Sequence, residues 1–531
     1  VLVSAARRAM SMLDFRLAER LARAAADAGG GFEASHAVAE ALVGEGRTEA
    51  AEEMLAALEA AAEGESQRAG ASLARAQNLF WRLGRSAEAE QVLEAAQREI
   101  DDVRLRDEIA AARSTFALFL GDAPAALRIL MPILERAGSP DAAPLEATMT
   151  AGWALLVVGR LEESIELNER MREPAATALA DDAPFALEWF EKTLCCALHV
   201  VGRLDEAAEV GEAAHRRAVE RGADPARAMH GFALGWLAET QGRPAAAVEW
   251  LRDANAAFRE ADMFGHGPVS LAQEALSQSL LGDLGAAAAA QEEARATHVE
   301  SNRMQDCFVE RGEVWLAAAR GETSRAIETA LACAESMRSM GFRMFEAAAL
   351  FDAVRLGERR VAPARLASLA EIVDGQLVGL YAAHANALAR GDADALMASA
   401  SAFEELGAPL LAAEACAAAA GLHRDTGRAS SALAAASRGQ ALARRCQGAS
   451  TPALAGLTEP LPLTPREREV VTLAAGGLSK REIAERLVVS VRTIDNHLHS
   501  AYSKLGVTGR EELPAILDPA APHSSAFDRA V

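Results

Sequence analysis

Lysine is almost missing from this chain. Only Lys192, Lys480 and Lys504 occur among 531 residues, so nearly all of the positive charge comes from arginine. A Walker-type phosphate-binding loop needs a lysine that follows glycine and precedes serine or threonine. Glutamate or serine precedes each of the three lysines, so these 531 residues contain no such loop.

Other chemical signatures are also scarce. The six cysteines form no CxxC pair, and no group of Cys and His residues has the spacing of zinc ligands. No apolar run reaches the ~18 residues that span a bilayer, and no signal segment opens the chain. No nucleophile–base pattern is present. We therefore expect buried thiols, no catalytic residue, no metal or other cofactor, no membrane partner and a cytoplasmic protein.

Alanine and acidic residues are abundant. Hydrophobic residues make up 51% of the chain but aromatic residues only 5%. Alanine has the highest helix propensity, so we expect an all-α fold, and 531 residues are too many for a single core. The chain has 76 acidic and 54 basic residues, and its formal net charge of −22 opposes binding to a polyanion.

A glycine followed by Arg, Asp or Glu recurs between helical stretches. Apart from one gap after position 321, the intervals are 36 to 43 residues, which fits two helices and two turns. Glycine closes a helix in the left-handed conformation without a steric penalty, and stacked helical hairpins bury their faces on their neighbours. The pattern predicts an α-solenoid over residues 1–446 that resembles the tetratricopeptide repeat (TPR) family. The register between about 340 and 380 stays open. The glycines stand at positions 46, 84, 121, 159, 202, 242, 282, 321, 391 and 427.

Three tryptophans occupy equivalent places in this repeat. Trp153, Trp236 and Trp315 each lie six residues before a turn glycine. Equivalent repeat positions favour a packing role over an aromatic ligand site. Solenoids nevertheless offer concave surfaces, so a small-molecule or protein effector on the repeat region is a reasonable expectation.

Helical periodicity stops at residues 447–460, which read QGASTPALAGLTEP and are expected to form a linker. The composition changes after it. Residues 461–517 carry eight basic and seven acidic residues, a net charge of +1, so the rest of the chain carries −23. We expect a separate domain at 461–520 and a flexible tail at 521–531.

Three helices are marked in this domain. Thr464 with Glu467 and Ser479 with Glu482 have the spacing of capping boxes, which start two helices. Val488 and Val489 are expected to form a turn, and Ser490 to cap a third helix that ends at Leu505. One face of the third helix is apolar, with Ile494, Leu498, Ala501 and Leu505. The opposite side carries Arg492, Asp495, Asn496, His499 and Ser503.

Five spaced blocks in this segment carry a family resemblance. They are LTPRE at 463–467, GLSxxEIA at 477–484, LxxS at 487–490, TIxxHL at 493–498 and KLGV at 504–507. By these blocks the segment resembles the four-helix C-terminal helix-turn-helix domain of LuxR-type (LuxR/GerE-like) transcriptional regulators. The resemblance implies that base-facing positions are held by Asp495, Asn496 and His499. It implies that phosphate contact or positioning falls to Lys480, Ser490, Arg492, Thr493 and Lys504.

Two residues depart from the family pattern. Asp495 stands where a basic or neutral residue is more usual; its carboxylate can accept a hydrogen bond from cytosine but repels phosphates. Pro514 would fall about five residues into the fourth helix, where proline disrupts a helix. That helix usually makes the dimer contact, so the expected dimer interface is the less secure part of the resemblance.

The arrangement of the chain suggests a function. A helical-repeat region before such a domain resembles the large ATP-binding LuxR-family regulators, without their N-terminal ATPase module in these residues. We expect a nucleoid-associated transcriptional regulator that binds double-stranded DNA at promoter sites as a homodimer or higher oligomer, with RNA polymerase as a candidate further partner. The alternative is a TPR-like interaction scaffold with a vestigial DNA-binding domain. An enzyme is not expected.

Overall fold

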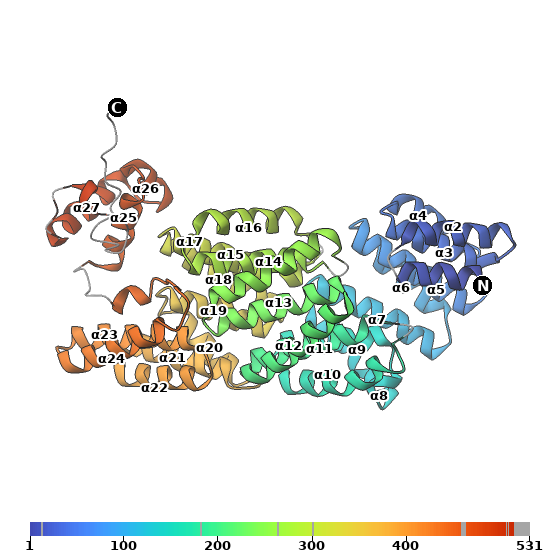
Figure 1. Ribbon diagram of the computed structural model, residues 1–531, viewed down its shortest axis with the longest axis horizontal. Coiled ribbons are helices and arrows are strands. Elements are labelled where there is room, and N and C mark those ends of the chain that lie inside the picture. Colours follow the sequence, from blue (N-terminus) through green and yellow to red (C-terminus); the bar gives the residue numbers. More distant parts are fainter. Residues whose placement is uncertain are drawn as a thin grey trace. The chain divides into compact units, whose positions relative to one another are not determined.

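The protein is described from a computed structural model, which covers residues 1–11, 14–180, 183–262, 265–299, 302–457, 463–505, 507 and 509–513. These residues form 27 α-helices and no strand, so the all-α expectation is confirmed (Figure 1). The chain divides into two compact units. The first comprises Val1–Thr193 with the short segments Val299–Met304 and Met340–Phe342, and the second comprises the remainder.

The first unit is built from antiparallel helices that follow one another along the chain (Figure 1). A π-helical turn, Asn78–Arg82, extends the fifth helix. The helices are α1 (Leu2–Ser11), α2 (Phe15–Asp27), α3 (Gly31–Gly44), α4 (Thr48–Ala60), α5 (Glu65–Gln77), α6 (Ser86–Glu99), α7 (Val103–Phe119), α8 (Ala123–Ala137), α9 (Leu145–Val158), α10 (Leu161–Ala176) and the start of α11 (Ala186–Val201).

The second unit continues the same pattern and ends in the last three helices of the chain. Its solenoid helices are α12 (Leu204–Arg221), α13 (Asp224–Thr240), α14 (Pro244–Glu260), α15 (Gly267–Leu280), α16 (Leu284–Thr297), α17 (Asp306–Ala319), α18 (Thr323–Ser339), α19 (Arg343–Arg355), α20 (Ala362–Ala370), α21 (Leu377–Arg390), α22 (Ala393–Glu405), α23 (Pro409–Asp425) and α24 (Ala429–Ala443). After these come α25 (Pro465–Ala475), α26 (Lys480–Arg486) and α27 (Val491–Leu505).

The turn glycines behave as the repeat predicts. All ten have a positive φ, between 65° and 101°, and each lies between the two helices of a hairpin. The open register is resolved by Gly357, with φ 111°, which separates α19 from α20. It lies 36 residues after Gly321 and 34 before Gly391. The repeat is therefore continuous.

Within the second unit, hairpins far apart in sequence touch through backbone groups. The backbone N–H of Gln376 donates to the carbonyl oxygen of Val201 at 3.2 Å, and that of Ser450 donates to Leu280 at 2.7 Å. The N–H of Ala246 donates to the side-chain oxygen of Gln447 at 3.0 Å. These bonds join segments about 170 to 200 residues apart, so the solenoid of this unit winds back onto itself.

Large side chains fill the spaces between hairpins. Trp153, Trp236 and Trp315 are 6%, 5% and 2% exposed, which agrees with a packing role. In the first unit, the buried Lys192 ammonium lies 4.3 Å from the ring centroid of Trp153 and 4.1 Å from that of Trp189. Such cation–π contacts compensate part of the desolvation of a buried charge. All six cysteines are buried, as expected.

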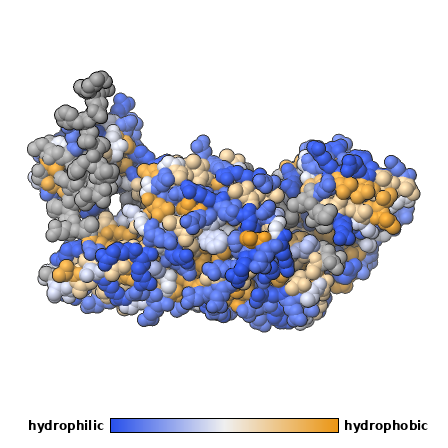
Figure 2. All heavy atoms as spheres, viewed as in Figure 1, coloured by the Kyte–Doolittle hydropathy of each residue, from blue (hydrophilic) through white to orange (hydrophobic). Residues whose placement is uncertain are grey.

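The described part of the predicted linker packs against the last two helices of the solenoid. Residues 454–457 form a 3₁₀ turn against α23 and α24. Arg424 donates to the carbonyl of Gly456 at 2.9 Å, and Gln440 donates to that of Leu457 at 3.0 Å. The tail at 521–531 lies outside the described residues. No helix among those described is both long and apolar enough to cross a membrane, and hydrophilic residues are spread over the face of the protein in Figure 2.

Candidate nucleic-acid interface

The three last helices share a small hydrophobic core of their own. Val470 and Val471 of α25, Ile483 of α26 and Ile494 of α27 are fully buried and belong to one cluster. Leu498 and Ala501 extend the buried face of α27, as the apolar spacing predicts. Burial of this face turns the other side of α27 to solvent, which is the side with the polar residues.

Both predicted capping boxes are formed. At the start of α25, the N–H of Thr464 donates to Glu467 Oε2 at 2.7 Å, and the N–H of Glu467 donates to Thr464 Oγ1 at 3.2 Å. At the start of α26, Ser479 and Glu482 make the same pair of bonds at 2.7 Å and 3.3 Å. Each box satisfies two amide groups that a helix N-terminus leaves open, which fixes where α25 and α26 begin.

Glu467 also ties the first helix to the third. Lys504 Nζ on α27 donates to its two carboxylate oxygens at 2.6 Å and 2.8 Å, and Ser500 Oγ donates to it at 2.6 Å. These donors, Lys504 first, together with the amide of Thr464, lower the pKa of Glu467 to about 2. Glu467 is only 4% exposed, so this ion pair is an internal clamp. Lys504 is thus engaged inside the domain, and its predicted phosphate contact stays a prediction.

The turn before α27 is held in an unusual conformation. Val488 has φ 54°, a left-handed value that a β-branched residue adopts only under strain, and its side chain is 90% exposed. The N–H of Val489 donates to the carbonyl of Ala484 at 3.0 Å and holds the turn in place. Ser490 then caps α27, because its Oγ accepts from the N–H of Thr493 at 3.1 Å. Ser490 and Thr493 thereby position the start of the third helix.

The exposed side of α27 presents unengaged polar groups. Arg492, Asn496 and His499 are exposed and share one side of the helix. Among the described residues, none of the three has a hydrogen bond or ion pair within the chain. Together they offer a guanidinium, an amide and an imidazole to a partner. These groups suit the edges of guanine and adenine in the major groove.

Asp495 differs from these neighbours. Its carboxylate forms an ion pair with Lys480 Nζ at the start of α26, and both side chains are 56% exposed. The pair joins a predicted base-facing residue to a predicted phosphate-facing residue. While it persists, Lys480 is withdrawn from phosphates and the negative charge of Asp495 is balanced.

Most remaining cations of the domain are also engaged. Arg510 donates to the carbonyls of Ala474 and Leu478 at 2.7 Å and 2.5 Å, which closes the ends of the loop between α25 and α26. Arg466 donates to Glu469 at 2.6 Å, and Arg486 pairs with Glu322 at the start of α18. A 3₁₀ turn, Arg510–Glu512, stands where the fourth helix was expected to begin, and Pro514 lies outside the described residues.

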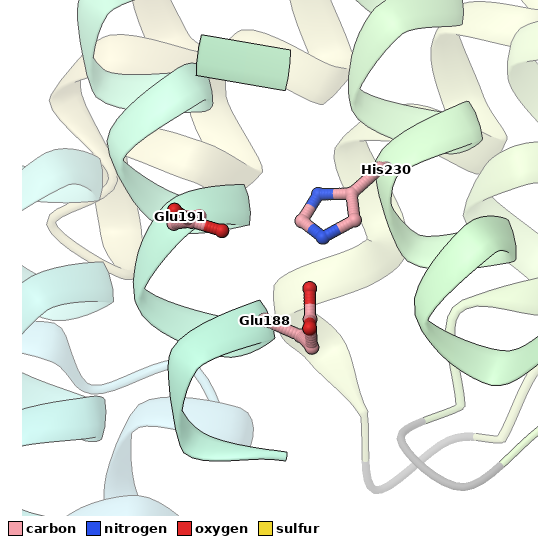
Figure 3. Close-up of side chains that lie close together, drawn as sticks. All are labelled: Glu188, Glu191 and His230. Atoms are coloured by element: carbon pink, nitrogen blue, oxygen red, sulfur yellow. The ribbon is translucent and has the colours of Figure 1, made fainter. Parts of the chain in front are cut away.

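Buried side chains with metal-ligand atoms do occur in the solenoid. Figure 3 shows Glu188 and Glu191 on α11 and His230 on α13, and all three are buried. The first two belong to one unit and the third to the other. Each takes part in an interaction within the chain, so we assign none of them as a ligand.

The comparisons agree with the geometry of the last three helices. Residues 461–516 match the family described as bacterial regulatory proteins, luxR family. The putative HTH-type transcriptional regulator Mb0914c of Mycobacterium bovis is 53% identical over 51 residues, which are 10% of this chain and 6% of that protein. The spore germination protein GerE of Bacillus subtilis is 46% identical over 50 residues, which are 9% of this chain and 68% of that protein.

The likeness of the solenoid to solved structures is more distant. A crystal structure of a Rap protein complexed with competence and sporulation factor aligns with 71% of this chain and 99% of that chain, at 12% identity and a TM-score of 0.47. The chain spans only about 6% of the length of the mycobacterial relative, whereas it covers two thirds of GerE. With its C-terminal helix-turn-helix domain at residues 461–516, this chain belongs to the luxR family of bacterial regulatory proteins.

Proposed function

We propose that this chain is a DNA-binding transcriptional regulator whose C-terminal domain reads the major groove. The observation that carries the proposal is the exposed side of α27, where Arg492, Asn496 and His499 have no partner among the described residues. Exposed polar groups on a helix contribute little to the stability of the fold, whereas each of these can form a hydrogen bond with a base edge. The N-terminal half of a recognition helix enters the groove; Arg492 and Asn496 lie in that half of α27, and His499 lies directly after it.

Each side chain has a role in this proposal. The amide of Asn496 can bond adenine through two hydrogen bonds, and Arg492 and His499 can reach guanine or a phosphate. Asp495 can accept from the amino group of cytosine once Lys480 moves to a phosphate. Ser490 and Thr493 hold the start of the helix in register. Two domains are needed to read a palindromic site, which supports a homodimer or higher oligomer on DNA.

The repeat region would supply regulation. Its stacked hairpins provide surface for a small-molecule or protein effector, and contact with RNA polymerase would couple DNA binding to transcription. The protein would act in the cytoplasm at the nucleoid. No catalytic step is part of this proposal.

The alternative is an interaction scaffold whose last domain no longer reads DNA. The observation in its favour is the Asp495–Lys480 ion pair, which places a carboxylate on the reading side and occupies a cation. The two functions differ in one measurable property, which is whether the protein selects a DNA sequence.

Selection from sheared genomic DNA by the full chain tests the proposal. We expect a recurrent site, and Asn496→Ala should lose about 1–3 kcal/mol of discrimination at one base position. Ser503→Ala is the matched control, because Ser503 is exposed on the same side of α27 but lies beyond the half that enters the groove. If neither the full chain nor residues 461–516 select a site, the scaffold is the correct function.

A further inference from the structure

The second unit contains a small polar hollow. Its volume is about 30 Å³, and side chains from five helices line it. Four of its ten lining residues carry buried charged groups, which is unusual for the inside of an alanine-rich solenoid. The polar residues at the hollow are Glu239 and Thr240 of α13, Arg311 of α17, Asp352 and Arg355 of α19, and Tyr381 of α21.

The charges around the hollow do not cancel. Arg311 Nε donates to Asp352 at 2.6 Å, and Arg355 donates to both carboxylate oxygens of Glu414 at 2.8 Å and 2.9 Å. These two ion pairs are neutral. Glu239 is 6% exposed, and burial raises its pKa, against which Arg311 and Arg355 act. When Glu239 is ionised, its carboxylate is the fifth charge and the group as a whole carries −1. A cation would balance this charge, whereas an anion would increase it.

Glu239 and Tyr381 leave hydrogen-bonding capacity at the hollow. Gln273 donates to Glu239 Oε2 at 2.9 Å, and no other donor to this carboxylate is found among the described residues. Tyr381 is 8% exposed, and its hydroxyl has no hydrogen bond within the part of the chain that the structure describes. Burial raises the pKa of Tyr381, with Arg311, Glu239, Asp352 and Arg355 all close enough to act on it. Its neutral hydroxyl therefore stands among the charged groups.

Size restricts what this hollow can hold. A volume of about 30 Å³ is roughly two to three times the ~10–15 Å³ that a cavity needs to hold one water molecule, so only a small group fits. An ammonium group is about as large as a water molecule, fits this space and carries donors on all sides, which suits the acceptors of Glu239, Asp352 and Tyr381 in the lining. A quaternary ammonium is larger than an ammonium group and has no N–H group to donate. Thr240 and Ala348 at the rim are partly exposed, so solvent and an alkyl substituent reach the hollow from their side.

We propose that this hollow is a binding site for an ammonium-type cation, either the free ammonium ion or the –NH₃⁺ group of a primary amine. Glu239 would supply the balancing charge and the strongest acceptor. Tyr381 would accept one further hydrogen bond, and Asp352 would retain its arginine partners while accepting another. The site lies on helices α13, α17, α19 and α21, whose mutual packing it would stabilise. It is independent of DNA binding and of the proposed function.

Calorimetric titration of the full chain at constant ionic strength tests this site. The probes are ammonium chloride and methylammonium chloride, with potassium chloride and tetramethylammonium chloride as controls. We expect saturable binding of ammonium and a saturable rise in the midpoint of thermal unfolding. Binding of methylammonium as well identifies an amine head with its substituent at the Thr240 rim; binding of ammonium alone identifies the free ion. Both results support the site.

Two variants and one control locate the binding. Glu239→Gln keeps the shape but removes the charge, and should weaken ammonium binding by about tenfold or more, since a charge-assisted bond is lost. Tyr381→Phe should weaken it less and keeps the charge, so it remains informative if the first variant does not fold. Glu249→Gln makes the same change at an exposed position of α14 and should have no effect. Equal heats with potassium, no saturation, or undiminished binding by both variants would overturn the proposal.

Discussion

The clamp between α25 and α27 offers a sharp test of the helix-turn-helix domain. Glu467 and Glu482 occupy the same capping-box position, but only Glu467 also binds Lys504 and Ser500. Replacing either with glutamine keeps an oxygen that can accept from the cap amide. The difference between the two variants therefore isolates the bonds from Lys504 and Ser500.

The size of this difference follows from the contacts. A hydrogen bond to a charged group contributes about 1.5–3 kcal/mol, and Lys504 loses its charged acceptor in Glu467→Gln. We expect this variant to lower the free energy of unfolding of residues 461–516 by that amount at pH 7, and Glu482→Gln to lower it far less. Far-UV circular dichroism during urea unfolding measures both, because the segment has its own core.

Lowering the pH should remove the difference in stability between wild type and Glu467→Gln. The pKa of Glu467 is lowered to about 2 in the folded domain, while an unfolded glutamate titrates near ~4.3. A depressed folded pKa gives stability that is present above the unfolded pKa and is lost as the pH falls toward the folded one. Wild type and Glu467→Gln should therefore converge between about pH 4.3 and 2. Equal destabilisation by both glutamine variants at pH 7 would refute the clamp.

Further outcomes follow from other contacts. Asp495→Asn frees Lys480 for a phosphate, so DNA binding should tighten. The slope of log K against log salt should steepen by about 0.9 per domain. Both changes should vanish when Lys480→Ala is added. Gly375→Ala places a Cβ 2.5 Å from a backbone oxygen of the α11–α12 turn, while Gly357→Ala meets nothing within 4 Å. Both glycines have positive φ, so urea unfolding should show about 1–3 kcal/mol of extra loss for Gly375→Ala from crowding. Glu414→Ala removes both carboxylate oxygens that buried Arg355 bonds and leaves it only Asp352, at 3.6 Å. This variant should cost about 3 kcal/mol by the same measurement, the lower end of the range for a broken buried pair; a loss below about 1 kcal/mol would contradict that burial.

Local signals predicted the fold of the repeat region because its turns depend on local chemistry. Glycine takes a positive φ without a Cβ penalty, so the ten turn positions were visible in the sequence. Gly357 was missed although Glu358 follows it, since the next helix starts only at Ala362 and the spacing there is shorter. The contacts of Gln376 with Val201 were not predictable, because periodicity carries no information on residues 175 positions apart.

In the candidate site, too, local features were predictable from the sequence and contacts between distant residues were not. The capping boxes and the exposed side of α27 follow from residues three or four positions apart, and the structure contains both. The partners of Lys480 and Lys504 lie 15 and 37 residues away. The family pattern could assign these lysines a role, but only the packing of α25 and α26 on α27 reveals what they contact. Glu467 was recognised as a cap, whereas its second role as a clamp required the third helix in place.

These engaged cations change how the acidic chain can bind DNA. Non-specific affinity depends on the number of phosphates that free cations neutralise. In this domain Lys480, Lys504 and Arg510 are bonded within the chain, and Arg492 is an exposed cation without such a partner among the described residues. The rest of the chain carries −23, so phosphate contacts alone hold the protein weakly. In the proposed binding mode, affinity would then come from base contacts at Asn496 and His499 and from several domains bound at adjacent sites. A protein built this way discriminates well because little of its binding energy is independent of sequence.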